Sequence, residues 1–233
     1  MTEMVITAFK PKEIGTSIEK LKELGYDKDI YGNELENEDQ ILELMEQDVI
    51  LPKGIGSLEE GGDTVFFRVA NFIDDLLEKF YKLPKFYNLK SKEDLVGHLV
   101  IGIAPHISAG MIARVIGFSE TMGFYAHPVY HCAVRRDADG DEVAIILLMD
   151  ALLNFSKKYL PSHRGARQDT PLVLTPIIIP AEVDDMVFDL DTVSEYPLEL
   201  YKACLDYKMP WEIKLPKFGD RLGKPEQYQG IMF

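Results

Sequence analysis

The sequence predicts an α+β protein whose central part, residues 96–180, forms a compact α+β domain or a small β-barrel. Three observations predict this class. Apolar residues follow helical spacing from Val65 to Lys82, whereas Leu99–Ile103 is an apolar run of the β type. Turns that contain Gly or Pro separate the short segments of the central part. The 233 residues, 46% of them apolar, suffice for one large domain or two small ones with a sizeable core.

Residues 1–95 are predicted to form a mainly helical flanking region. A capping box that begins at Thr16 starts a short helix, and Gly25 ends it. Residues 48–52 predict a short strand that finishes at a proline. The spacing of apolar residues over 65–82 predicts a longer amphipathic helix.

The central region and the C-terminal extension are predicted to mix strands and helices. The predicted strands are 99–103, 124–134, 172–175 and 177–179. The predicted helices are 108–118, capped by Ser108, and 143–160, which is apolar nearly all round and therefore buried. Residues 181–233 are predicted to be an extension of helix and loop, with one helix over 197–207 that starts at a proline.

The charge is unevenly distributed along the chain. A net charge of −14 argues at first against a nucleic-acid partner. Residues 1–95 carry 12 basic and 21 acidic side chains, and residues 169–233 carry 6 and 12. Residues 96–168 carry 7 basic and 6 acidic side chains, and four of those acids stand together at 137–142. The acidic excess therefore lies in the flanks, which leaves the centre compatible with a polyanionic partner.

Cysteine content and hydropathy limit the setting of the protein. Cys132 and Cys204 are too few for a disulfide framework or a four-cysteine zinc site. No run of 18 or more uncharged apolar residues predicts a transmembrane helix, and residues 1–15 lack the layout of a signal peptide. We therefore expect a reducing, cytoplasmic setting.

Three aspartates alternate in one short run, at Asp137, Asp139 and Asp141. In an extended or tightly turned backbone, residues two apart lie on the same side, so these carboxylates can converge. Converging carboxylates repel one another unless a cation lies between them, and hard divalent ions such as Mg2+ take oxygen ligands. Gly140 leaves room for close approach to the backbone. The run predicts a metal site, and we call residues 137–141 the aspartate run.

A helix cap and a calcium loop are the alternatives to this metal site. Asp141 and Glu142 precede the predicted helix over 143–160, where acidic residues cap free N–H groups. A cap does not account for Asp137 and Asp139. A calcium loop of the EF-hand type beginning at Asp137 would need Gly at its sixth position and Glu at its twelfth, but Glu142 and Leu148 stand there.

Basic residues near the aspartate run are candidates for contact with phosphate. Arg135 and Arg136 come just before it and offer planar donors. Arg164 and Arg167 follow in a loop that contains glycine, and they are better candidates than Lys157 and Lys158, which suit a solvated helix end.

His127 and His131 are four residues apart, with Cys132 beside them, which is a spacing that metal ligands use on a helix. Pro128 and its β-prone neighbours argue against a helix there. Buried or hydrogen-bonded histidines are therefore favoured over a zinc site.

The aspartate run matches D-x-D-G-D, the metal-binding signature of the two-barrel polymerases. The surrounding segments resemble the large subunit of archaeal family D DNA polymerase along essentially the whole chain. The matching segments are 9–15, 36–41, 97–102, 104–106, 108–110, 125–128, 152–156, 159–161, 171–174 and 221–225.

The resemblance implies a double-psi β-barrel over about residues 96–180 with flanking helical segments. It implies a DNA-directed DNA polymerase, that is, Mg2+-dependent nucleotidyl transfer to a primer 3′-hydroxyl in DNA replication. The implied partners are primer-template DNA, a dNTP, the rest of the large subunit and a small nuclease subunit, in a nucleoid-associated location. That large subunit is several times longer than this chain, so the chain looks like the part that carries the second catalytic barrel, whether as an excerpt, a split gene product or a divergent short version.

By the same resemblance, Asp139 and Asp141 take the place of the two catalytic, metal-binding aspartates. The family usually has Asn-Cys before them, where this chain has Asp137 and Ala138, and Asp in place of Val143. Asp137 brings the run closer to the three-aspartate pattern of RNA polymerases, which predicts an auxiliary metal ligand. The lysines that neutralise the triphosphate belong to the other barrel in this family, so the isolated chain is expected to bind Mg2+ weakly and not to polymerise.

Two functional hypotheses follow. The first is a catalytic module of a replicative DNA polymerase. The second is a structural or nucleic-acid-binding barrel in which the aspartates serve only as helix caps.

Overall fold

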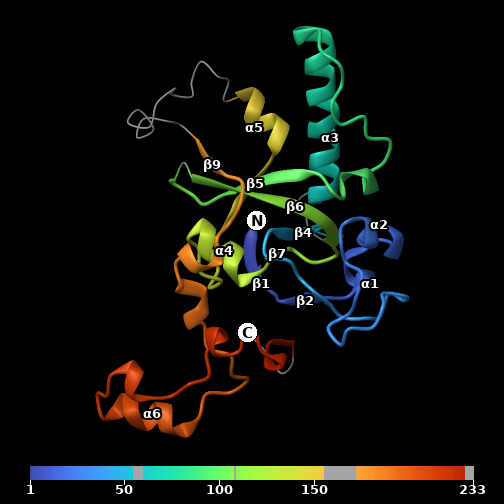
Figure 1. Ribbon diagram of the computed structural model, residues 1–233. Helices are drawn as coiled ribbons and strands as arrows, with labels where there is room; N and C mark the ends of the chain where they lie inside the picture. Colours follow the sequence, from blue (N-terminus) through green and yellow to red (C-terminus); the bar gives the residue numbers. More distant parts are fainter. Residues whose placement is uncertain (55–59, 108, 155–171, 229–233) are drawn as a thin grey trace. The chain divides into compact units, whose positions relative to one another are not determined.

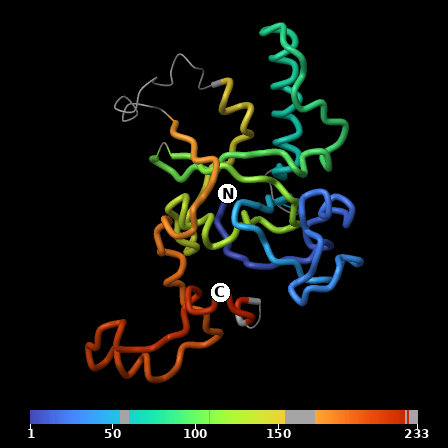
Figure 2. The backbone as a smooth tube through the Cα atoms, in the orientation of Figure 1, coloured from blue at the N-terminus to red at the C-terminus, as the bar shows by residue number. Residues whose placement is uncertain are grey.

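The computed structural model describes residues 1–54, 60–107, 109–154 and 172–228 (Figure 1). Two compact units divide the chain, Met1–Asp184 and Asp185–Phe233. The first unit holds a seven-stranded mixed sheet and the aspartate run. Figure 2 shows the path of the backbone, in which the N-terminal strand runs through the middle of this unit.

The main sheet combines parallel and antiparallel pairs. Its strand order is β1-β7-β4-β6-β5-β8, with β9 beside β6. The pairs β1–β7, β4–β6 and β6–β9 are parallel, and the pairs β4–β7, β5–β6 and β5–β8 are antiparallel. β2 and β3 form a separate antiparallel pair. The strands are β1 Thr2–Val5, β2 Ala8–Phe9, β3 Leu42–Glu43, β4 Asp48–Pro52, β5 Leu99–Ile103, β6 Ala109–Ser119, β7 Gly123–Ala126, β8 Ala144–Leu147 and β9 Val173–Thr175.

Helices pack on the sheet of the first unit and make up part of the second unit. The α-helices are α1 Pro11–Ile14, α2 Ile18–Glu23, α3 Gly62–Asp75, α4 Pro128–Val134, α5 Leu148–Asn154 and α6 Leu198–Leu205. α3 continues as a π-helical segment, Leu76–Tyr81. Short 3-10 helices span Glu93–Leu95, Pro180–Glu182, Met186–Asp189, Pro210–Glu212, Phe218–Asp220 and Pro225–Tyr228. Among the described helices, none has the length and apolar character needed to cross a membrane.

The core of the first unit lies between the sheet and these helices. α3 packs against α5, β4 and β8, and α4 packs against β1 and β6 (Figure 1). α3 buries Phe66, Ala70 and Ile73, whose spacing places them on one helical face. A second cluster joins α2 to the sheet and contains Phe9, Ile14, Leu21, Tyr26, Leu35, Leu42, Leu44, Ile50 and Ile116.

The mixed sheet with its helices agrees with the predicted α+β class. The structure confirms the predicted strands 48–52 and 99–103 and the predicted helices 65–82 and 197–207 in type. β1 and β4 come from the first 54 residues and complete the sheet to which the central strands contribute. The domain boundaries at 95 and 180 and the double-psi topology stay predictions.

The prediction of a helix over 108–118 is wrong, because Ala109–Ser119 forms strand β6. β6 lies between β4 and β5 and pairs with both. Val115, Ile116 and Phe118 are all buried, so the segment is covered on both faces. An apolar run of this kind shows no alternation, and its period alone does not separate a strand from a helix.

The predicted helix over 143–160 is also wrong at its start. Residues Ala144–Leu147 form strand β8 against β5, and helix α5 begins only at Leu148. The part of this prediction beyond residue 154 lies outside the described residues. The predicted strand over 177–179 is irregular chain.

The predicted strand over 124–134 is wrong after Ala126, and the capping residue of α2 differs from the predicted one. Strand β7 ends at Ala126, and helix α4 begins at Pro128 with His127 as its cap. At α2 the capping residue is Ser17, whose Oγ accepts a hydrogen bond from Lys20 N at 3.2 Å. Thr16 instead donates its hydroxyl to the carbonyl of Ile116 at 2.7 Å and ties the helix start to β6.

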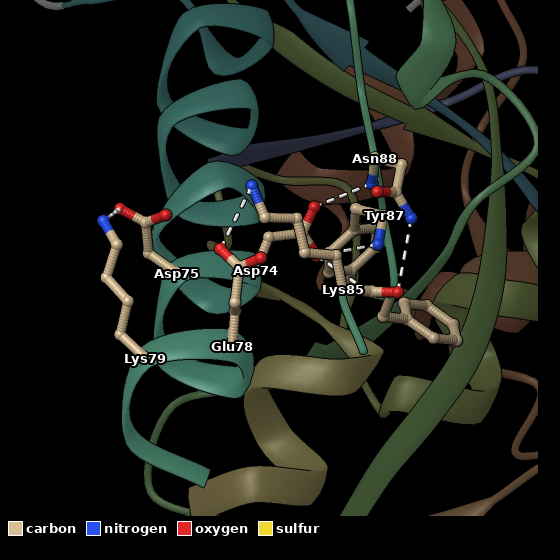
Figure 3. Close-up of polar contacts among 8 residues, drawn as sticks. Asp74, Asp75, Glu78, Lys79, Lys85, Tyr87 and Asn88 are labelled. Atoms are coloured by element: carbon tan, nitrogen blue, oxygen red, sulfur yellow. Dashed lines mark hydrogen bonds and ion pairs between the residues drawn. The ribbon is translucent and has the colours of Figure 1, made fainter. Parts of the chain in front are cut away.

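The buried carboxylate of Asp74 links α3 to the segment that follows it (Figure 3). Asp74 is 3% exposed and accepts hydrogen bonds from the backbone N–H groups of Phe86, Tyr87 and Asn88 at 2.7–2.9 Å. Removing the carboxylate leaves these donors unsatisfied, which is costly in a buried site.

We expect Asp74→Ala to lower the free energy of unfolding by about 3 kcal/mol, measured by denaturant titration. Asp75→Ala is the matched control, because the Asp75 side chain is about half exposed and forms an ion pair with Lys79 across one helical turn (Figure 3). That control is expected to change stability by less than about 0.5 kcal/mol. Equal losses in both variants would contradict the role given to Asp74.

Candidate metal centre

The aspartate run follows directly from the end of helix α4. Pro128 stands at the first helical position, and His127 Nδ1 accepts the N–H of Val129 at 3.2 Å. The helix ends at Val134, and its C-terminal cap, Arg135, has a φ of +60° in the left-handed region. Arg136 N then donates to the carbonyl of His131 at 3.1 Å, so the chain reverses as it leaves the helix.

The end of the run is held by strand β1. Glu3 N donates to the carbonyl of Asp141 at 3.0 Å, and Val143 N donates to the carbonyl of Met1 at 2.9 Å. Gly140 has φ +114°, and a β-carbon at this position would have nothing within 4 Å. The residue is therefore required for its backbone conformation, and the space beside it stays open.

The structure rules out a helix cap as the role of the acidic residues. Asp141 and Glu142 lead into strand β8 and not into a helix. Helix α5 begins six residues after Glu142, at Leu148. Within the described residues, no helix N-terminus directly follows Asp141 and Glu142 for their carboxylates to cap.

The three aspartates differ in exposure. Asp139 is exposed, whereas Asp137 and Asp141 are half-buried. Burial raises the pKa of the Asp137 carboxyl above its ordinary value, and the negative charges of Asp139 and Asp141 raise it further. The buried Oδ1 of Asp137 has no hydrogen-bond partner among the described residues. A cation beside Asp137 would offset both the burial and the repulsion.

The candidate ligands suit a hard divalent cation, because all of them are carboxylate oxygens that are partly accessible to solvent. Within the described ranges, no three His, Cys, Asp or Glu side chains already stand together as a ligand set for a metal ion. A shared ion would therefore need rotation of the carboxylates. The exposure of Asp139 and the open space at Gly140 leave room for that rotation.

Arg135 and Arg136, which precede the aspartate run, make different contacts. Arg136 Nη1 donates to Asp141 Oδ2 at 3.2 Å, and its Nη2 donates to the carbonyl of Pro105 at 3.3 Å. Arg136 thus orients Asp141. Arg135 is exposed and lines a hollow of about 950 Å³ together with His106 and Asp184. Arg164 and Arg167, the other predicted phosphate contacts, lie outside the described residues.

The histidines stand on or next to a helix, which corrects the expectation that the segment is extended. Burial lowers the pKa of His127 to about 4, which suits its use as a neutral acceptor at the helix cap. His131 is fully buried, with its Nδ1 3.2 Å from Oε1 of the buried Glu3. The favoured interpretation, buried and hydrogen-bonded histidines, agrees with this geometry.

Sequence reasoning missed Glu3 altogether. β1 alternates exposed and buried residues, and Glu3 occupies an inward position together with Val5. A glutamate on the apolar face of a short alternating strand is the signal that could have revealed it.

Comparison with known proteins covers the whole chain. Residues 1–233 match the family described as DNA polymerase II large subunit DP2, catalytic domain. The chain is 54% identical, over its full length, to the DNA polymerase II large subunits of Archaeoglobus fulgidus and Pyrococcus furiosus, and 46% identical to that of Methanocella arvoryzae. It covers 20%, 18% and 20% of these proteins, so it spans about a fifth of their length. The chain belongs to the family of the DP2 catalytic domain of the DNA polymerase II large subunit.

Proposed function

We propose that this chain is the catalytic module of a DNA-directed DNA polymerase and that, as part of a larger assembly, it serves to extend a primer 3′-hydroxyl by Mg2+-dependent nucleotidyl transfer. Membership of the DP2 catalytic-domain family supports the reaction class. The observation that carries the proposal is the aspartate run, which lies in a turn between α4 and β8 with one carboxylate exposed and two half-buried. The proposal includes a double-psi β-barrel over about residues 96–180.

Asp139 and Asp141 are the residues that would hold the metal ions, with Asp137 as an auxiliary ligand. When bound, divalent ions in such a site activate the attacking hydroxyl and neutralise charge on the leaving pyrophosphate. Arg136 fixes the Asp141 carboxylate through its Nη1 contact. The run is anchored by backbone bonds at both ends, which limits the reorganisation that the site would need before reaction.

The proposed partners are primer-template DNA, a dNTP, the remainder of a large subunit and a small nuclease subunit. Arg135, with Arg164 and Arg167, would contact phosphate groups, since arginine offers planar paired donors. Arg136 would contribute to the same positive region while it holds Asp141. The charge distribution supports a polyanion at this place, because the excess of acidic residues lies in the flanks of the chain.

A chimera tests the proposal directly. This chain replaces the matching segment of the Pyrococcus furiosus large subunit, to which it is 54% identical. We expect the chimeric assembly to extend a primed template in the presence of Mg2+. A folded chimera without primer extension, beside an active parent protein, would favour the alternative of a non-catalytic barrel that binds nucleic acid.

Asp137→Asn tests two expected effects of the Asp137 carboxylate, one on stability and one on metal affinity. The raised pKa means that ionised Asp137 costs stability, so the substitution is expected to raise the melting temperature in the absence of metal. The gain should shrink as the pH falls through the pKa of Asp137, because the unaltered carboxyl then becomes neutral as well. Affinity for Mn2+ should fall, by about tenfold, if Asp137 is an auxiliary ligand.

Thermal unfolding at several pH values and Mn2+ titration followed by paramagnetic resonance measure these two quantities. Glu142→Gln is the control, since Glu142 is exposed and lies next to the run. A variant that is less stable and binds Mn2+ unchanged would contradict both effects.

A further inference from the structure

Two buried side chains support the aspartate run, Glu3 of β1 and His131 of α4. Both are 0% exposed, and His131 Nδ1 lies 3.2 Å from Glu3 Oε1. The other ring nitrogen, Nε2, lies 3.0 Å from the carbonyl of Met4 and carries a hydrogen, because a carbonyl only accepts. With Nε2 bonded to Met4, Nδ1 is the ring nitrogen that faces the carboxylate.

Among the described residues, neither oxygen of the Glu3 carboxylate has a hydrogen-bond partner, and Oε1 faces His131 Nδ1 at 3.2 Å. Burying an ionisable pair is a poor way to gain stability, because the loss of hydration offsets most of the attraction. Two apolar side chains of similar volume would join β1 to α4 at least as well. Packing alone therefore does not account for the pair.

The main chains of the same two residues hold the two ends of the aspartate run. The carbonyl of His131 accepts the N–H of Arg136 at the start, and the N–H of Glu3 donates to the carbonyl of Asp141 at the end. The ion pair between Arg136 and Asp141, at 3.2 Å, joins the two ends directly. His131, Arg136, Asp141 and Glu3 are thus linked in a closed ring of contacts that includes both ends of the run.

We propose that Glu3 and His131 are a positioning pair that fixes the separation of the two ends of the aspartate run and so prepares Asp139 and Asp141 to share an ion. The inference rests on the proposed function. It assigns no contact between the pair and an ion or substrate. Outer partners of this kind set the orientation of the groups that bind the metal, and their loss weakens metal affinity by about ten- to a hundredfold.

The test compares three variants of the 233-residue chain. Glu3→Leu removes the polar contact and keeps the volume. Glu3→Gln keeps a polar contact, because the amide can donate to His131 Nδ1. Asp74→Ala is the matched control, since it removes a buried carboxylate of α3 that forms no bond with the run.

Two quantities are measured, the hydrogen-exchange rates of the amides in residues 136–143 and the affinity for Mn2+. For Glu3→Leu we expect exchange about tenfold faster in this segment and Mn2+ affinity at least about tenfold weaker. Glu3→Gln should restore both to within about threefold of the unaltered chain, and Asp74→Ala should leave both unchanged although it lowers stability.

The outcomes distinguish the inference from the proposed function. Unchanged exchange in Glu3→Leu would overturn the positioning pair, even where the chain binds Mn2+. Faster exchange with unchanged Mn2+ affinity would overturn its role in ion binding. Failure of the unaltered chain to bind Mn2+ would contradict the proposed function and, with it, that role, whereas the exchange rates would still report whether the pair holds the run.

Discussion

Asp139→Asn and Asp141→Asn, each introduced into the chimeric polymerase, are expected to reduce primer extension by about a thousandfold or more. An amide keeps the size of the side chain and removes the charge that holds a divalent ion. Metal ions at such sites supply several kcal/mol of transition-state stabilisation, and about 4 kcal/mol corresponds to a thousandfold in rate. The turn should survive, because its anchoring bonds from Arg136 N and Glu3 N involve main-chain acceptors, and the amide oxygen of Asp141→Asn can still accept a hydrogen bond from Arg136 Nη1.

Glu142→Gln is the control that isolates the position of the charge. Glu142 belongs to the same acidic cluster, is exposed, and lies one residue beyond the run. Its substitution removes one negative charge from the same turn, and activity is expected to stay within about twofold, as for a surface change. Equal losses of activity in all three variants would indicate that the total negative charge of the turn matters and the position of each carboxylate does not. Retention of activity in both aspartate variants would refute the catalytic assignment.

Local patterns were most informative where one face of an element is apolar and the other is exposed. α3 is the clearest case, since Phe66, Ala70 and Ile73 recur at helical spacing and are buried together. β6 could not be predicted in the same way. α1 and α4 pack against it, and its partner strand β4 comes from a segment more than 60 residues earlier in the sequence. Pairing over such distances leaves no local signal.

In the candidate site, too, some features follow from a local pattern and others depend on distant segments of the chain. The aspartate run is a local motif, so its chemistry was evident from residue types and spacing. What holds the run in place comes from outside it. Glu3 lies more than 130 residues earlier, and its backbone bond to Asp141 depends on the bridge that β1 forms with the segment at Glu142. The parallel pairing of β1 with β7 brings these segments together, and no short pattern encodes it.

The isolated chain is expected to show no primer extension, whereas activity should appear once it is joined to the rest of a large subunit. The reason is the negative charge that accumulates at the site. An incoming nucleotide adds a triphosphate to a site that already holds three carboxylates, and metal ions offset only part of this charge. Of the two arginines ahead of the run, Arg136 is committed to Asp141, and only Arg135 is exposed.

We therefore expect that Arg135, with the proposed phosphate contacts Arg164 and Arg167, does not suffice and that further cations come from elsewhere in a complete polymerase. The measurement compares extension of a labelled primer by the chain alone, by the chimera and by the unaltered Pyrococcus furiosus protein at equal concentration. Mn2+ binding by the chain alone serves as the control for a folded site. Extension by the chain alone at a rate near that of the chimera would show that this module carries every charge the reaction needs. It would also contradict the requirement for a second cationic partner.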